Sequence, residues 1–141
     1  MFIISIFCNV FYHFIQIDNN NLKALHVRGC AYCRNGEYKL SIEDFSRILS
    51  LSANNIEALL ARAKSYTMAG LVDAGISDLS LVLKLDADNV AAYYARAGCY
   101  NSLGMFSNAI EDYNLALFKD QGRKVRSPNG KMETSRLRTF R

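Results

Sequence analysis

Apolar and small side chains recur at intervals of three and four residues through most of the region between residues 22 and 119. In the first such segment, Leu22, Leu25, Gly29 and Tyr32 form one stripe. This spacing predicts amphipathic helices, because residues three and four apart share one face of an α-helix. The predicted helices span Leu22–Asn35, Lys39–Ser52, Ile56–Ala69, Val72–Leu85, Val90–Leu103 and Phe106–Lys119.

The pattern repeats with a period of 34 residues and needs no gap over residues 22–123. A fixed period of this length is typical of repeat architectures, in which each unit hides its apolar face only by stacking on the next unit. Each unit then consists of a helix, a tight turn and a second helix. The identical columns are Ala24/Ala58/Ala92, Arg28/Arg62/Arg96, Tyr32/Tyr66/Tyr100, Gly36/Gly70/Gly104, Ile42/Ile76/Ile110, Asp44/Asp78/Asp112 and Leu49/Leu83/Leu117.

The ends of the predicted helices carry residues that suit them. Gly36, Gly70 and Gly104 can adopt the left-handed conformation that ends a helix, because glycine has no Cβ to clash. An asparagine before each first helix can accept a hydrogen bond from exposed backbone N–H groups. These asparagines are Asn21, Asn55 and Asn89. Small residues in two further columns predict close approach of the paired helices; these columns are Gly29/Ala63/Ala97 and Ser41/Gly75/Ala109.

The chain resembles the tetratricopeptide repeat (TPR) family, whose pattern W-x2-L-G-x2-Y…A-x3-F…P repeats every 34 residues. The third unit reads Tyr93-x2-Arg96-Ala97-x2-Tyr100 and then Ala109-x3-Tyr113. The tryptophan and the closing proline of the family pattern are absent from all three units. The resemblance implies an all-α superhelix of stacked antiparallel helix pairs, an α-solenoid, with TPR units at 22–55, 56–89 and 90–121.

Arginine stands in all three units where the family pattern has leucine, and aspartate recurs sixteen residues later. The planar guanidinium can hold a carboxylate through two parallel hydrogen bonds. We therefore predict structural ion pairs between the two helices of each unit. The expected pairs are Arg28–Asp44, Arg62–Asp78 and Arg96–Asp112.

The TPR resemblance also implies that the first helices line a concave groove that binds a peptide or a protein segment. The candidate groove residues are Lys23, His26, Val27, Cys30, Cys33, Arg34, Glu57, Leu60, Ala61, Lys64, Thr67, Met68, Ala91, Tyr94, Ala95, Gly98, Asn101 and Ser102. The lysine–asparagine clamp with which some TPR proteins grip a C-terminal carboxylate is missing, so chaperone C-termini are not the expected ligand. Alternatively, these residues form only a solvated inner face, and the binding site lies on other repeats.

The first 21 residues allow two interpretations. Phe11 falls in the column of Phe45, Leu79 and Tyr113, so the segment fits the second helix of a preceding repeat. A targeting segment is the alternative, although neither a basic start nor a small-residue cleavage site is visible. A stable membrane span is not expected, because Asn9, His13 and Gln16 interrupt the apolar run.

Residues 122–141 break the period and are predicted to form a disordered basic tail. The net charge is +4, but residues 1–120 alone carry −2 and residues 121–141 carry +6. Binding of the tail to nucleic acid or an anionic membrane is the alternative function, since such binding depends on Lys and Arg. The basic residues are scattered rather than clustered, so a solvated terminus is favoured and a nucleic-acid partner is not expected.

Nothing in the sequence indicates a reaction, a cofactor or a metal site. Cys30 and Cys33 match C-x-x-C, but a redox motif needs a βαβ context and a zinc site needs a second pair of ligands. The two histidines have no repeating nucleophile nearby, and no glycine-rich phosphate loop occurs. We predict a non-catalytic scaffold or adaptor in the reducing cytoplasm, with protein partners. Because both ends of the repeat array lack a polar capping helix, self-association is also expected.

Overall fold

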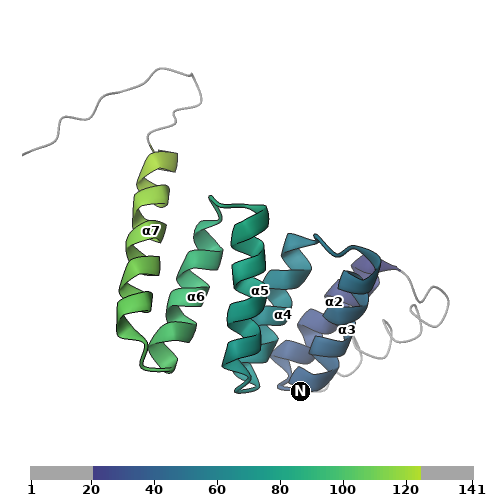
Figure 1. Cartoon of the computed structure of the whole chain (residues 1–141). Helices are drawn as coiled ribbons and strands as arrows, with labels where there is room; N and C mark the ends of the chain where they lie inside the picture. Colours follow the sequence, from purple (N-terminus) through teal and green to yellow (C-terminus); the bar gives the residue numbers. More distant parts are fainter. Residues whose placement is uncertain (1–20, 125–141) are drawn as a thin grey trace, which may run out of the picture.

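The computed structural model describes residues 21–124, and this part of the chain is entirely helical apart from short turns (Figure 1). Its helices are α2 (Leu22–Arg34), α3 (Tyr38–Leu51), α4 (Ile56–Met68), α5 (Val72–Leu85), α6 (Val90–Ser102) and α7 (Phe106–Lys124). The predicted all-α fold is confirmed, and the bounds of α2 to α6 agree with the sequence pattern to within one residue. The last helix instead runs five residues beyond Lys119, into the segment predicted to be disordered.

The local signals at the helix ends act as the sequence predicts. Gly36, Gly70 and Gly104 have φ angles of 82°, 80° and 74°, in the region that favours glycine. Asn55 accepts a hydrogen bond from the backbone N–H of Ala58 at 2.9 Å. The same cap occurs at Asn21 and Asn89, each three residues before the donor. Each unit therefore begins and ends by its own local chemistry.

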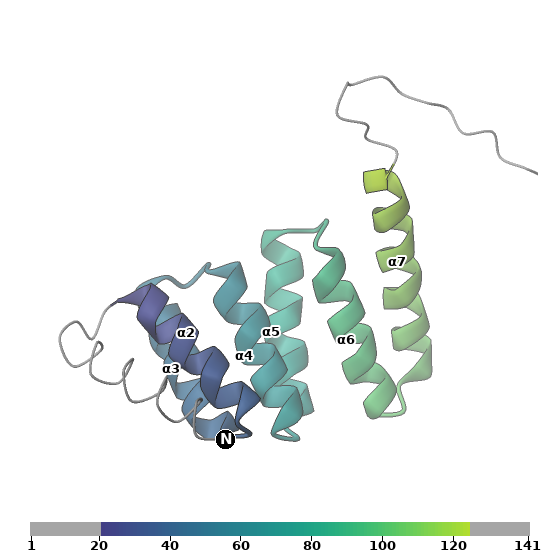
Figure 2. The ribbon, with the colours of Figure 1, turned by 180° about the vertical axis from the view of Figure 1, so that it is seen from behind.

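Consecutive helices pack side by side along a row that runs from α2 and α3 to α7 (Figure 1). The closest associations join the two helices of each repeat, and the second helix of one repeat then packs against the first helix of the next. Seen from behind, α2 and α4 lie in front of α3 and α5 (Figure 2). The first helices of successive repeats therefore share one surface of the array.

Two apolar clusters form the core, and each one joins neighbouring repeats. The first cluster consists of Ala24, Leu25, Phe45, Ile48 and Ala58, so α2 and α3 meet the first helix of the second repeat. The second cluster joins α4 and α5 to α6 in the same way; its members are Leu59, Ala63, Leu79, Val82, Ala92 and Cys99. Because no repeat closes a core by itself, stability depends on stacking.

A small polar network lies between the first two repeats. Ser41 Oγ donates to the carbonyl oxygen of Gly29 at 2.8 Å and lies 2.8 Å from Ser65 Oγ on the next repeat. Both serines are fully buried. The contact satisfies polar groups that would otherwise cost free energy inside the stack.

In the second repeat, the hydroxyl that corresponds to that of Ser41 comes from a different residue. Gly75 stands where Ser41 stands in the first repeat, and a Cβ there would come within 2.9 Å of Thr67 Oγ1. That hydroxyl donates to the carbonyl oxygen of Ala63 at 2.9 Å and lies 3.4 Å from Cys99 Sγ. Thr67 thus supplies from the first helix the hydroxyl that the second helix lacks.

We expect Gly29→Ala to destabilise the fold by about 1 kcal/mol, although alanine favours helices. A Cβ on Gly29 would lie 3.0 Å from the Phe45 ring, whereas Ala63 faces the smaller Leu79 in the second repeat. Adding Phe45→Leu should therefore reduce the penalty of Gly29→Ala relative to its cost in the wild type. Chemical denaturation of the two single variants and the double variant measures this coupling. Additive effects would contradict the proposed clash.

Two predictions concern parts of the chain outside the described residues. These are the half-repeat or targeting segment before Asn21, and the tail after Lys124. Among the helices that the structure describes, none is long and apolar enough to cross a membrane.

Candidate protein-binding surface

The arginine column joins the two helices of each repeat. Arg28, Arg62 and Arg96 each direct Nε and Nη2 at the two carboxylate oxygens of the aspartate sixteen residues later. The hydrogen-bond distances lie between 2.5 and 2.8 Å. The carboxylates are nearly buried, with side-chain exposures of 6%, 9% and 4%. This fork geometry is the strong, bidentate form of an ion pair.

Two of these arginines also reach back to the preceding repeat. Arg62 Nη1 donates to Ser46 Oγ, and Arg96 Nη1 donates to Ser80 Oγ, both at 3.0 Å. Hydrogen bonding to the aspartate raises the pKa of both guanidinium groups despite their partial burial. Each of these two arginines, which like any arginine is charged at neutral pH, links three helices.

A tyrosine ring lies near each of the three guanidinium groups. The Arg62 guanidinium carbon lies 5.6 Å from the centre of the Tyr66 ring, and the Arg28–Tyr32 and Arg96–Tyr100 pairs repeat this contact. Such cation–π contacts add to the ion pairs. The arginine column thus joins the two helices of every repeat and stabilises their orientation relative to each other.

The first-helix surface, which we define as the eighteen candidate groove residues on α2, α4 and α6, is accessible throughout. None of these residues is buried. The exposed ones are Lys23, Val27, Arg34, Glu57, Lys64, Met68, Ala91, Tyr94, Ala95, Gly98, Asn101 and Ser102. The half-buried ones are His26, Cys30, Cys33, Leu60, Ala61 and Thr67.

The structure brings several of these side chains together near the middle of α2. Cys30 Sγ lies 3.8 Å from His26 Nδ1. Burial raises the pKa of the Cys30 thiol, although the nearby charges of Arg34 and Lys64 oppose this shift. The thiol is therefore protonated at neutral pH and is not activated for nucleophilic attack. The positively charged side chains of Arg34 and Lys64 thus lie close enough to act on this thiol.

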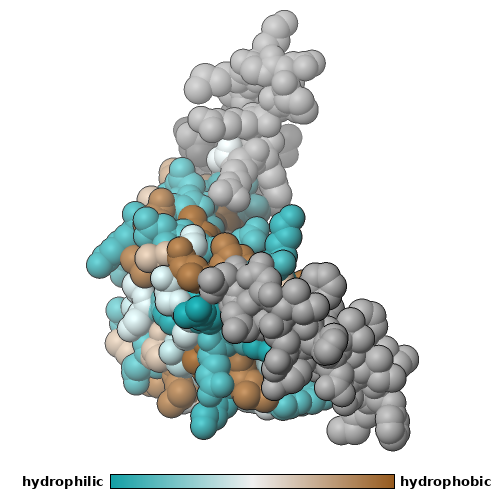
Figure 3. Space-filling model, turned by 90° about the vertical axis from the view of Figure 1, so that its right-hand side faces the viewer, coloured by the Kyte–Doolittle hydropathy of each residue, from teal (hydrophilic) through white to brown (hydrophobic). Residues whose placement is uncertain are grey.

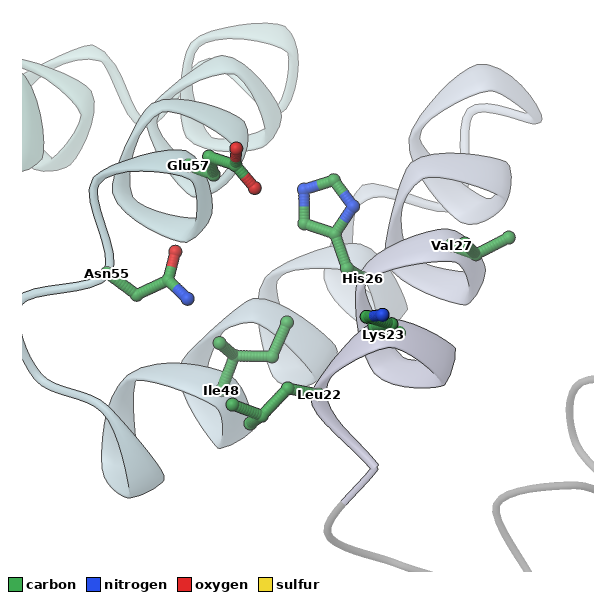
Figure 4. A pocket seen from close by; sticks show the side chains of 7 residues that line it. All are labelled: Leu22, Lys23, His26, Val27, Ile48, Asn55 and Glu57. Carbon is green, nitrogen blue, oxygen red and sulfur yellow. The ribbon is translucent and has the colours of Figure 1, made fainter.

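A pocket of about 310 Å³ opens between the first turns of α2 and α4 (Figure 4). The ring of His26 points from α2 towards Glu57 on α4 (Figure 4). The pocket thus combines an apolar floor with an imidazole, a carboxylate and an ammonium group. Its lining residues are Leu22, Lys23, His26, Val27, Ile48, Asn55 and Glu57.

Some lining residues were not expected from the sequence. Leu22, Ile48 and Asn55 lie outside the predicted groove set, because they belong to a helix start, a second helix and a cap. At the opposite end of the surface, the ring of Tyr94 packs against Tyr113 of α7 with centroids 6.1 Å apart. These contacts join different elements, so the pattern of a single helix does not indicate them.

The exposed face at the α2–α3 end is chemically mixed. Hydrophobic residues lie in several places among hydrophilic ones on this face (Figure 3). No group of three or more metal-ligating side chains is assembled within residues 21–124. This end of the array thus offers scattered apolar contacts among polar groups rather than an enclosed small-molecule site.

These features define a helical repeat protein, in which antiparallel helix pairs stack along one axis. The sequence profile of the tetratricopeptide repeat matches residues 22–55 and 90–117. The middle unit, residues 56–89, carries the same seven columns. Residues 22–55 and 90–117 are therefore tetratricopeptide repeats.

Solved structures support the same fold. A crystal structure of MamA superposes with a TM-score of 0.76 at 24% identity, covering 82% of this chain and 67% of that one. The 41-end form of MamA from Desulfovibrio magneticus RS-1 gives a TM-score of 0.79 at 14% identity, covering 82% and 66%. The chain spans about two thirds of the length of these proteins. No curated protein matches the sequence.

Proposed function

We propose that the chain is a non-catalytic interaction module whose first-helix surface binds a peptide or a protein segment. The observation that carries this proposal is the pocket between α2 and α4, which lies on the predicted groove and opens to solvent. A bound segment would place one side chain in the pocket and run along α4 and α6 towards Tyr94. We place this activity in the cytoplasm, as the sequence predicts.

The pocket favours a ligand side chain with an apolar stem and a polar end. Leu22, Val27 and Ile48 would contact the stem, while His26 and Glu57 could exchange hydrogen bonds with the end. Large aromatic groups such as Tyr94, which is 40% exposed, contribute most strongly to binding at protein interfaces. The proposed site therefore has an anchoring pocket at one end and an aromatic contact at the other.

Selection from a random peptide library against the full chain tests the proposal. We expect a shared sequence motif, and we expect Leu60→Glu/Tyr94→Glu to weaken binding of the selected peptides at least about tenfold, measured by fluorescence anisotropy. A matched control, Leu40→Glu/Leu81→Glu, introduces the same charges on the exposed sides of α3 and α5. This control should bind like the wild type.

Circular dichroism must show that both double variants keep their helices. Equal loss in the two variants would mean that binding does not depend on the first-helix surface. Retained binding by Leu60→Glu/Tyr94→Glu would lead to the same conclusion. If a copy that ends at Gln121 lost all binding, the basic tail would be the site instead.

We also propose that the array associates with itself through an uncapped end. The supporting observation is the row of apolar side chains that α7 exposes. Repeat arrays without a polar terminal helix commonly expose the surface that would otherwise join the next repeat.

A further inference from the structure

The outer face of α7 is apolar and exposed. Phe106, Ile110, Tyr113 and Leu117 are 62%, 60%, 38% and 48% exposed, respectively. Among the described helices, α7 contacts only α6. A row of four large apolar side chains on one helix face is a typical interaction site rather than an ordinary solvent surface.

The same columns are covered in the first two repeats. Ile42 and Ile76, which correspond to Ile110, are half-buried. Leu49 and Leu83, which correspond to Leu117, are half-buried as well. Leu49, Ile76 and Leu83 pack against the apolar clusters that join each repeat to the first helix of the next. The chemistry of the α7 face is therefore that of a helix-packing interface.

The residues after α7 do not carry the pattern that would cover this face as a further repeat. Arg126 stands in the column of Ala58 and Ala92, and Gly130 stands in the arginine column. Pro128 would fall inside the first helix, where proline costs about 3 kcal/mol. The sequence that follows thus offers no equivalent of α4 or α6.

The spacing of the exposed residues fits a two-helix seam. Phe106, Ile110, Tyr113 and Leu117 are separated by four, three and four residues, which is the spacing of the core positions of a heptad. Ser107 and Asn114 flank this seam on its open side and carry no charge. A second α7 helix could therefore approach without repulsion between like charges.

We propose that two copies of this chain pair through α7, antiparallel and about a two-fold axis. The proposal rests on the self-association proposed above and names its interface. In this arrangement Ile110 packs against Tyr113 of the second copy, and Phe106 packs against Leu117. A two-fold interface of this kind closes after two copies, so a dimer forms rather than a filament.

Light scattering of the full chain after size-exclusion chromatography, over a concentration series up to about 100 µM, tests self-association. We expect a dimer, and we expect Ile110→Glu to raise its dissociation constant about thirtyfold or more. The control is Phe118→Glu, because Phe118 is 77% exposed but lies outside the seam. This control should remain dimeric. A wild-type monomer throughout the series, or equal effects of the two variants, would overturn the proposal.

Cysteine cross-linking tests the geometry and does not require a destabilised variant. In an antiparallel pair, Ser107 of one copy faces Asn114 of the other, so oxidised Ser107→Cys/Asn114→Cys should form dimers with a 107–114 disulfide identified by mass spectrometry. The two positions lie about 10.5 Å apart within one helix, beyond the reach of an internal disulfide of about 7 Å.

The matched control for cross-linking is Asn108→Cys/Leu115→Cys, which has the same spacing on another exposed face of α7. It should not form the corresponding 108–115 disulfide. A dimer that lacks the 107–114 disulfide would retain self-association but overturn the α7 interface, for example in favour of end-to-end stacking on α2. Peptide binding to the first-helix surface is measured separately, so failure of either proposal can be recognised.

Discussion

Asp78→Ala is expected to lower the free energy of unfolding by about 3 kcal/mol. The substitution removes both acceptors of the Arg62 fork, and only the single hydrogen bond to Ser46 would remain among those that the structure assigns to this guanidinium. The Arg62 side chain is 20% exposed, so water can replace part of the loss. The expected cost therefore lies at the lower end of the range for breaking a buried pair.

Chemical denaturation followed by circular dichroism measures this effect. Asp78→Asn should cost less than Asp78→Ala, because an amide oxygen can still accept one hydrogen bond. The double variant Arg62→Met/Asp78→Leu should recover much of the stability, since no charge is then left without its partner. A loss below about 1 kcal/mol for Asp78→Ala would show that the pair behaves as an exposed surface ion pair.

The helices and their caps could be predicted from the sequence because they depend on local chemistry. Asn55 caps α4 through an N–H only three residues away, and Gly70 ends the same helix through its own backbone conformation. Each of these signals occurs three times, once in every repeat. A helical periodicity that is ambiguous in one unit is therefore clear when the three units are compared.

Contacts between repeats were harder to predict, because they depend on the offset between neighbouring units. The bond from Arg62 to Ser46 links residues of different repeats, and no single-unit pattern indicates it. In the second repeat, Gly75 leaves room for the hydroxyl of Thr67, which takes the place that the Ser41 hydroxyl has in the first repeat. This replacement depends on side-chain geometry between two helices.

The sequence predicts the candidate site as a surface of first helices but does not predict the pocket within it. The helical period places His26 and Glu57 on first helices, but it does not show that they face each other across a pocket. That placement depends on how α2 and α4 lie side by side (Figure 4). Ile48 enters the pocket from a second helix, so a rule restricted to first helices misses it.

Leu59→Ala should also lower the free energy of unfolding by about 3 kcal/mol. Leu59 is 1% exposed and lies in the cluster that joins α4 and α5 to α6, so the cavity would weaken two repeats at once. Its neighbour Leu60 provides a matched control, since the same substitution there removes a half-buried side chain from the first-helix surface. Leu60→Ala should cost only about 1 kcal/mol.

The two leucine variants separate stability from binding. At temperatures where both are folded, Leu59→Ala should bind the selected peptides like the wild type, whereas Leu60→Ala should bind them more weakly. Denaturation curves and anisotropy titrations on the same samples give both quantities. Equal destabilisation by the two substitutions would contradict the distinct positions of the two side chains. Weaker binding by Leu59→Ala alone would mean that the peptide responds to packing between repeats rather than to contacts on their first helices.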